Sequence, residues 1–515
     1  MLLSKLLKIA GNISPLYALN LFMDLIGKNP KRALMFLQIA DSEMLEKLSR
    51  KKAVEQAKRA SKRVKEYKRF LKTKGFDKKE IKNFEDFQIL PLTSKENYIK
   101  TCKNFEDVFV DSDLSVIRTI YESSGYTGKP FLWAHNSKIE EEEIKFSRIG
   151  LENNFLVSSK NTLFINGFAL GSWVSGMKFA FIMNKIGPTI NPGADYDGIL
   201  KILDTLGRKF SQIIIGGYPP FIKNLLEKGT AKGMNFEEYN INFLLAGEGF
   251  SESFRDYLYT LIKSSPEGKK SKIYSVYGTA DTGVIGVNEN EDTIKIRRLA
   301  EKNSELKKRL FNKIISAETP MLFQYNPLSF FIEENKEEII ITTVSPNEIQ
   351  PVIRYNIHDS GGVIPYKKMQ EILKNEGIDT KIKLKLPFLH INGRTGGVIS
   401  INSAKVYPET ISRALYKNKS LAGLITGRFR LKKEYTKNQE VVFKIDIELK
   451  EKINPTDKLK KNFENIIKRE LSEANMEYKN MINHYSKNAL PNINLIKYNN
   501  FDGLNINKEI KYKYT

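Results

Sequence analysis

The sequence of 515 residues contains one cysteine, Cys102, and only four histidines. A single cysteine cannot form an intrachain disulfide, and it cannot supply the cysteine clusters that hold structural zinc. The histidines (His135, His358, His390 and His484) are not spaced like metal ligands. We therefore expect a cytoplasmic protein that depends on neither disulfides nor zinc.

Long apolar runs are also missing. Residues 1–27 are the strongest candidate for a targeting segment, but charged side chains such as Lys5, Lys8 and Asp24 interrupt them. Because no stretch of about 18 apolar residues exists, a membrane-spanning helix is not expected. Two interpretations of this segment remain open: an amphipathic helix that packs on the protein, or peripheral contact with a membrane surface.

Acidic residues are fewer than basic ones, 60 against 83, which gives a formal net charge of +23. The basic residues are spread along the chain and are not interleaved with aromatic residues, so we do not expect a nucleic-acid partner. A basic surface is compatible with anionic small molecules. With 41% hydrophobic residues, the chain has enough apolar material for a packed core.

From about residue 110 to 390, short β-rich runs alternate with amphipathic helices, a pattern typical of βαβ units around a largely parallel sheet. A charged stretch at 37–72 with helical spacing precedes it, and the pattern restarts after Arg394. We expect an α/β protein with a helical extension (1–83), a large domain with mixed parallel sheets flanked by helices (84–393) and a small mobile α+β C-terminal domain (394–515). The runs expected as strands are 115–121, 162–166, 212–215, 242–245, 271–277, 338–344, 352–357 and 440–449. The expected helices are 138–151, 196–206, 220–228, 251–263, 404–416 (with a turn) and 456–474.

A glycine-rich segment at 121–130, YESSGYTGKP, follows one of these strands. Glycines let the backbone approach a ligand closely, and hydroxyls and a lysine can contact phosphate oxygens. The spacing differs from the Walker pattern, and an ordinary hairpin turn remains an alternative. The candidate phosphate ligands are Ser123, Ser124, Gly125, Thr127, Gly128 and Lys129.

Three later segments carry polar groups at strand ends or turns. In 274–283, YSVYGTADTG, Tyr277 can stack on a base and Asp281 can hold Mg²⁺, although Asp281 could simply cap a turn. In 352–362, VIRYNIHDSGG, Asp359 at a strand end can accept from ribose hydroxyls, or form an Asx turn. In 393–402, Arg394 can pair with phosphate or ribose, and the glycines that follow permit a pivot.

The order of these four segments resembles the adenylate-forming superfamily, and most closely its phenylacetate–CoA ligase branch. The family loop SSGTTGKP matches 123–130, its YGxTE matches 277–281, its RYxxGD matches 354–359, and its GRxDD hinge matches 393–397. Weaker similarities occur at 90–95 and 246–249. The resemblance covers roughly residues 84–515.

The resemblance implies further site residues. Gly247 and Glu248 would lie against adenine, Gly278 and Thr279 would belong to the ATP- and AMP-binding residues, and a lysine near the chain end would be catalytic. Lys511 fits that role best, with Lys508 and Lys513 as alternatives. The hinge would be Thr395, Gly396 and Gly397. The sequence departs from the family pattern at four places: Asp281 replaces Glu, Ala280 replaces Thr, His358 replaces Gly, and Gly396 and Gly397 replace Asp.

The implied reaction is ATP- and Mg²⁺-dependent activation of an aryl or acyl carboxylic acid through an acyl-AMP, followed by transfer to CoA. Phe168, Trp173 and Tyr218 would line the acyl pocket, or could simply belong to the core. An amine, a carrier protein or a sugar remains an alternative acceptor. A basic membrane- or nucleic-acid-associated scaffold with a degenerate site is an alternative of another class. The sequence fixes neither the acid nor the oligomeric state.

Overall fold

The computed structural model describes residues 27–77, 80–122, 132–171, 174–247, 249–264, 271–279, 281, 287–311, 319–394, 399–401, 404–435, 441–474, 478–479 and 490–501. Several predicted site residues lie outside these ranges. They are the loop residues Ser123, Ser124, Gly125, Thr127, Gly128 and Lys129, together with Trp173, Glu248, Thr395, Gly396, Gly397, Lys508, Lys511 and Lys513. The same holds for residues 1–26 and for the side chain of Arg394.

Helices form the N-terminal part of the described chain, as the helical spacing predicts. Asn29 and Asp41 cap the first two helices by accepting from backbone N–H groups in the first turn. Apolar residues between 34 and 48 belong to a small separate cluster, whereas those from Ala53 onward join the core of the large domain, where Tyr67 and Phe87 are fully buried. The helices are α3 (Pro30–Ile39), α4 (Ser42–Arg63), α5 (Lys65–Thr73) and α6 (Phe84–Gln88), followed by the short helices η1 (Lys95–Ile99) and η2 (Phe105–Val108).

A twelve-stranded sheet forms the centre of the large domain, in the order β11-β12-β13-β14-β10-β9-β8-β7-β6-β4-β5, with β1 beside β13. Its parallel part has buried β-branched residues on both faces because helices cover each side. The parallel strands are β4 (Thr162–Asn166), β5 (Thr189–Ile190), β6 (Gln212–Gly217), β7 (Ile241–Ala246) and β8 (Ile273–Tyr277). Helix α7 (Ser137–Phe155) precedes β4, and the helices between the strands are α8 (Val174–Asn184), α9 (Tyr196–Leu206), α10 (Pro219–Ala231) and α11 (Glu252–Leu261), with the short helices η3 (Gly207–Lys209) and η4 (Phe236–Glu238).

The other part of this sheet is antiparallel, apart from the β1 pairing. It confirms the expectation of an antiparallel meander around residues 338–357. The strands are β1 (Thr93–Ser94), β9 (Val287–Asn288), β10 (Met321–Tyr325), β11 (Phe330–Asn335), β12 (Glu338–Thr343), β13 (Tyr355–Ile364) and β14 (Phe388–Arg394). The helices α12 (Glu291–Lys302), α13 (Ser304–Phe311) and α14 (Tyr366–Asn375) pack against it through a separate apolar cluster. A detached hairpin of β2 (Thr119–Glu122) and β3 (Leu132–His135) flanks the predicted phosphate loop.

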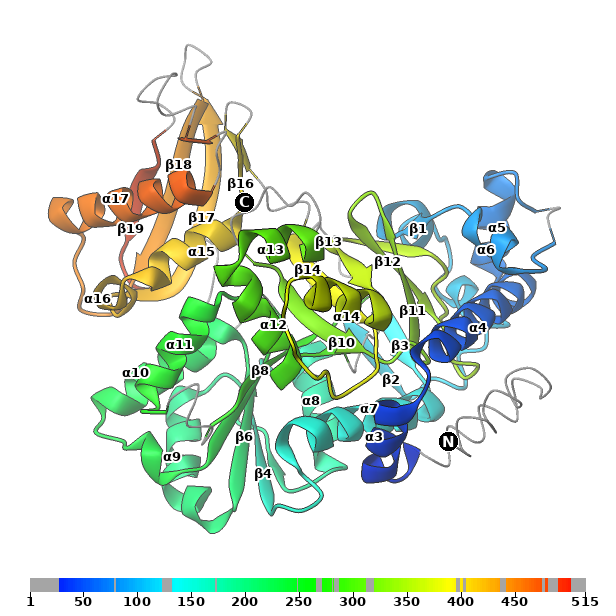
Figure 1. Ribbon diagram of the computed structural model, residues 1–515, viewed down its shortest axis with the longest axis horizontal. Helices are drawn as coiled ribbons and strands as arrows, with labels where there is room; N and C mark the ends of the chain where they lie inside the picture. The colour runs from blue at the N-terminus through cyan, green and yellow to red at the C-terminus, as the bar shows by residue number, and fades with distance from the viewer. Residues whose placement is uncertain are drawn as a thin grey trace.

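The C-terminal part is a separate α+β unit with its own core, drawn in yellow to red in Figure 1. Its main sheet pairs β17 with β18 antiparallel and β18 with β19 parallel. Phe443, Ile445 and Ile447 alternate toward the helices and are fully buried. The elements are β15 (Ile399–Ile401), β16 (Ala404–Val406), α15 (Pro408–Lys417), α16 (Lys419–Ala422), β17 (Ile425–Tyr435), β18 (Val441–Leu449), α17 (Asp457–Ala474) and β19 (Asn492–Ile496).

The predicted fold class is confirmed: a large mixed sheet flanked by helices is followed by a small α+β unit. No helix within the described ranges combines the length and apolar character needed to cross a bilayer.

Candidate active site

Two motifs that are far apart in the sequence meet at the carboxyl end of β8. Tyr277 is the last residue of this strand, and its hydroxyl donates a hydrogen bond to Asp359 Oδ2 over 2.7 Å. Asp359 is 6% exposed, so its carboxylate is largely withdrawn from water. A buried carboxylate beside the carboxyl end of the parallel strand β8 lies where α/β proteins bind ligands.

Asp359 was expected at a strand end, and this prediction is wrong, because it lies inside β13. The two glycines that follow serve strand packing rather than a turn. A side chain at Gly361 would overlap the backbone carbonyl of His390 on β14, and the strand pairing shifts at this point. Asp359 pairs in register with Arg394, so the third and fourth motifs lie side by side through their backbones.

A second hydrogen bond joins the two motifs. The buried Tyr355 hydroxyl donates to Asp281 Oδ2 over 3.0 Å, and the Tyr355 ring meets Trp133 edge-on at 6.1 Å between centroids. Within the described ranges, no group of three or more His, Cys, Asp or Glu side chains is arranged to hold a metal ion. A single carboxylate nevertheless suits Mg²⁺, which usually takes one or two carboxylates together with substrate phosphates.

Two residues expected to line the acyl pocket, Phe168 and Tyr218, lie together next to Gly247, which the resemblance places against adenine. Gly247 has φ +100°, and a side chain there would overlap the Tyr218 ring, which therefore lies directly against the Gly247 backbone. Tyr218 also meets Phe168 edge-on at 5.3 Å between centroids, and its hydroxyl is 3.4 Å from Ser175 Oγ. The result is an aromatic wall with one polar end.

Arg354 belongs to the third motif, but its guanidinium is bound by other groups of the protein. It is buried, and its guanidinium donates to Glu333 Oε1 and Leu90 O, each over 2.6 Å, and to Gln88 O. Thr93 adds a bond from Oγ1 to Ile353 O of 2.7 Å. Arg354 therefore holds residues 88–93 beside β13. This contact explains why the 90–95 segment and the third motif are found in the same sequence.

His358, which stands where the family has glycine, keeps the backbone conformation that glycine favours. Its φ is +60°, a region that costs a side chain free energy. The imidazole faces two carboxylates, with Nδ1 3.3 Å from Glu338 Oε1 and Nε2 3.5 Å from Glu96 Oε2. These contacts offset part of the strain.

A buried charge cluster beneath the β2–β3 hairpin was not expected from the sequence. Glu143 of α7 pairs with Lys178 of α8 and lies 3.2 Å from His135 Nδ1 of β3. Burial alone would raise the pKa of Glu143, but Lys178 and His135 hold it below its ordinary value. Lys178 Nζ also lies 5.2 Å from the ring centroid of Tyr121, so the cluster anchors both strands that lead to the predicted phosphate loop.

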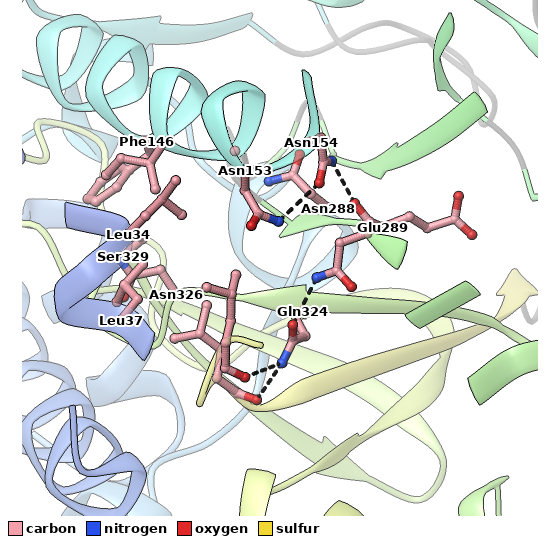
Figure 2. Close-up of a pocket in the computed structure, with 15 residues that line it drawn as sticks. Leu34, Leu37, Phe146, Asn153, Asn154, Asn288, Glu289, Gln324, Asn326 and Ser329 are labelled. Atoms are coloured by element: carbon pink, nitrogen blue, oxygen red, sulfur yellow. Dashed lines mark hydrogen bonds between the residues drawn. The ribbon is translucent and has the colours of Figure 1, made fainter. Parts of the chain in front are cut away.

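A cavity of about 50 Å³ lies away from these residues, between α3, α7 and the strands β9 and β10. Figure 2 shows the side chain of Asn153 bonded to that of Asn154 along the wall. A separate amide bond runs from Asn290 Nδ2 to Gln324 Oε1 over 2.9 Å. Leu34 and Leu37 of α3 complete the lining. The cavity has room for a few water molecules at most, so it is a packing feature of the N-terminal helices rather than a substrate pocket.

Comparison of the sequence with protein-family models and with curated proteins finds no match. Solved structures do match. 2-Hydroxyisobutyryl-CoA ligase in the postadenylation state with 2-HIB-AMP aligns over 90% of this chain and 88% of that chain, with 14% identity and a TM-score of 0.62. An acyl acid amido synthetase in complex with 2,4-DB aligns over 95% of both chains, with 13% identity and a TM-score of 0.56. The chain has the fold of the adenylate-forming ligases.

The first of these ligases also matches in a second state. Its open conformation with 2-HIB-AMP and CoA aligns over 90% of both chains, but with a TM-score of only 0.53.

Proposed function

We propose that this chain activates a carboxylic acid with ATP and then transfers the acyl group to an acceptor, for which CoA is the first candidate. The observation that carries the proposal is the Tyr277–Asp359 hydrogen bond, with the Tyr355–Asp281 bond beside it. Together they bring two separate motifs to one edge of the sheet in a fold shared with acyl-CoA ligases.

In the first half-reaction, a substrate carboxylate oxygen attacks the α-phosphorus of ATP. A new P–O bond forms, the bond to the β-phosphate breaks, and acyl-AMP and pyrophosphate result. Asp359 would accept from the ribose hydroxyls, and the Tyr277 ring would lie against the adenine. Asp281 would hold Mg²⁺, which supplies positive charge to the phosphates when it is bound.

In the second half-reaction, the acceptor thiol loses its proton, its sulfur attacks the acyl carbonyl, and AMP leaves. The proposed division places the helical extension at 1–83, the large domain at 84–393 and the mobile domain at 394–515. Rotation about Thr395–Gly397 would exchange a catalytic lysine, Lys511 or Lys508, for the acceptor. The loop residues 123–129 and Arg394 would hold the phosphates.

The acid would fit against Phe168 and Tyr218, with Trp173 nearby in the sequence. An aromatic wall favours an aryl or acyl acid, in keeping with the phenylacetate–CoA ligase-like resemblance. The test is pyrophosphate release from ATP across a panel of aryl, fatty and short hydroxy acids, with Asp359→Ala as the control. Acid-dependent release that is lost in this variant supports the proposal. No release with any acid would instead favour the scaffold interpretation, which vesicle and DNA binding at two salt concentrations would then test.

Amide formation is the second candidate, since the fold also matches an amido synthetase over 95% of both chains. The acceptor that stimulates AMP release distinguishes thioester formation from amide formation. AMP release that rises with CoA indicates a thioester product, whereas release that rises with an amino acid indicates an amide.

A further inference from the structure

The C-terminal domain rests on two helices of the large domain. Helix α15 contacts α11, and strand β17 contacts α10; in Figure 1 these two green helices lie below α15 and α16. Phe254 and Tyr416 meet edge-on at 4.7 Å between centroids, and Lys419 Nζ lies 3.4 Å from Thr260 Oγ1. The boundary is thus partly apolar and well packed.

Two neighbouring residues of α10 bind two neighbouring carbonyls at the start of β17. Lys223 Nζ donates to Ile425 O over 2.7 Å, and Asn224 Nδ2 donates to Thr426 O over 3.0 Å. Lys223 is 0% exposed, which is exceptional for a lysine. We call these two bonds the docking contact.

The charges around Lys223 do not balance when every group is ionised. Glu227 of α10 lies 3.3 Å from Lys223 Nζ, and it also pairs with Lys450, which follows β18. Tyr257 of α11 donates to Glu227 over 2.6 Å, and the Tyr416 ring of α15 lies 5.7 Å from Lys223 Nζ. Two ammonium groups therefore share one carboxylate inside the interface.

Burial lowers the pKa of Lys223 to about 7, with Lys450 adding to this effect and Glu227 opposing it. A neutral amine can still donate to Ile425 O, and Glu227 then keeps Lys450 and Tyr257 as partners. The docked interface is balanced when Lys223 is neutral. Once the domain moves away, Lys223 meets water and recovers an ordinary lysine pKa.

We propose that Lys223 and Asn224 are positioning residues that hold the C-terminal domain docked on α10, and that this contact must open for the chain to pass between its two half-reactions. The inference rests on the proposed function, because only a two-step reaction requires the domain to move. The TM-score is 0.64 with 2-hydroxyisobutyryl-CoA ligase in the postadenylation state and 0.53 with its open conformation, which is compatible with a docked state as one stage of such a cycle.

Docking is coupled to release of a proton from Lys223. The docked pKa is lower than the free one, so docking is weakest below about pH 7 and strengthens as the pH rises toward the free value. One proton released corresponds to about a tenfold gain in the docking equilibrium per pH unit in that window.

A contact probe can measure docking without any substrate. Cys102 is the only cysteine in the sequence, so Cys102→Ser removes labelling at that position. A bimane fluorophore attached to Lys419→Cys is then quenched when it contacts Thr260→Trp across the interface. The same label opposite Thr260→Phe gives the unquenched reference. Quenching is measured from pH 6 to 9.5 in the parent protein and in three variants: Lys223→Met, Asn224→Ala and Lys232→Met. Lys232, at the end of α10, pairs with Asp197 of the large domain and serves as the matched control.

We expect quenching to rise with pH in the parent and in Lys232→Met. Asn224→Ala should dock more weakly but keep the pH dependence, and Lys223→Met should lose that dependence. Quenching in Lys223→Met and Asn224→Ala that equals the parent's at every pH would overturn the docking contact. Quenching that is constant over the whole range in the parent, or pH dependence that survives in Lys223→Met, would overturn its coupling to the Lys223 proton. Thioester formation from synthetic acyl-AMP, measured in parallel, should change more in Lys223→Met than pyrophosphate release does. If docking follows the pH as expected but no acid is activated, the docking contact stands and the proposed function fails.

Discussion

Replacing Asp359 by asparagine tests the proposed nucleotide site most directly. The carboxylate is 6% exposed and accepts from Tyr277 Oη over 2.7 Å, so asparagine keeps the volume and an acceptor for that bond but loses the charge. A hydrogen bond to a charged group contributes about 1.5–3 kcal/mol. If the carboxylate binds the ribose, losing one such bond raises the Kd for ATP about 10- to 150-fold.

The assay is calorimetric titration of ATP into the wild type, Asp359→Asn and Tyr277→Phe. Tyr277→Phe keeps the ring and the carboxylate, so its Kd should rise by less than that of Asp359→Asn. Thermal unfolding of each variant separates a local loss of affinity from a general loss of structure. An unchanged Kd in a well-folded Asp359→Asn would refute the ribose assignment.

The remaining predictions concern the metal, the catalytic lysine and the strained histidine. Asp281→Asn should raise the Mg²⁺ concentration needed for half-maximal pyrophosphate release, whereas Asp281→Glu should not; overlapping Mg²⁺ titrations would remove Asp281 from the site. Lys511→Ala should slow acyl-AMP formation about 10²- to 10⁴-fold but spare transfer from synthetic acyl-AMP, with Lys508→Ala assayed beside it; if neither variant slows adenylation, the C-terminal domain has no such lysine here. His358→Gly should raise the free energy of unfolding in urea by about 1 kcal/mol, because φ is +60° at this position; a loss of stability would mean that the Glu96 and Glu338 contacts outweigh the strain.

The strands and helices of the large domain follow from local pattern. Strand Thr162–Asn166 and helix Tyr196–Leu206 occur with the predicted bounds, because buried strands and amphipathic helices leave clear periodicity in a sequence. Asp359 shows where this reasoning fails. A polar residue followed by two glycines indicates a strand end, yet here the glycines allow two strands to approach closely within the sheet.

The site depends on contacts that no local pattern encodes. Arg354 donates to Leu90 O, which is 264 residues away in the sequence. From the sequence alone, a phosphate would have been an equally reasonable partner for its guanidinium. The Lys178–Glu143–His135 cluster is hidden for a related reason. Charged residues on a helix usually face water, so the sequence alone cannot distinguish a buried ion pair from a solvated helix face. Only the packing of α7 against α8 brings these charges together.

Gly247 offers a test of the acyl pocket that depends on geometry alone. Its φ of +100° suits glycine, and any side chain would also overlap the Tyr218 ring. Gly247→Ala therefore carries two separate costs: a backbone term of about 1–3 kcal/mol and an overpacking term of similar size. The sum should lower the free energy of unfolding in urea by about 2–6 kcal/mol.

Tyr218→Ala separates the two terms, because it removes the ring but leaves the backbone conformation. In the Tyr218→Ala background, Gly247→Ala should cost only the backbone term, so the double-mutant cycle should return a coupling of about 1–3 kcal/mol. The same Tyr218→Ala variant removes one side of the aromatic wall that Phe168 completes, and it should shift acid-dependent pyrophosphate release toward bulkier acids. Zero coupling would show that the ring can move aside freely. The wall would then be too soft to select an acid by its size, and specificity would have to come from the polar end near Ser175.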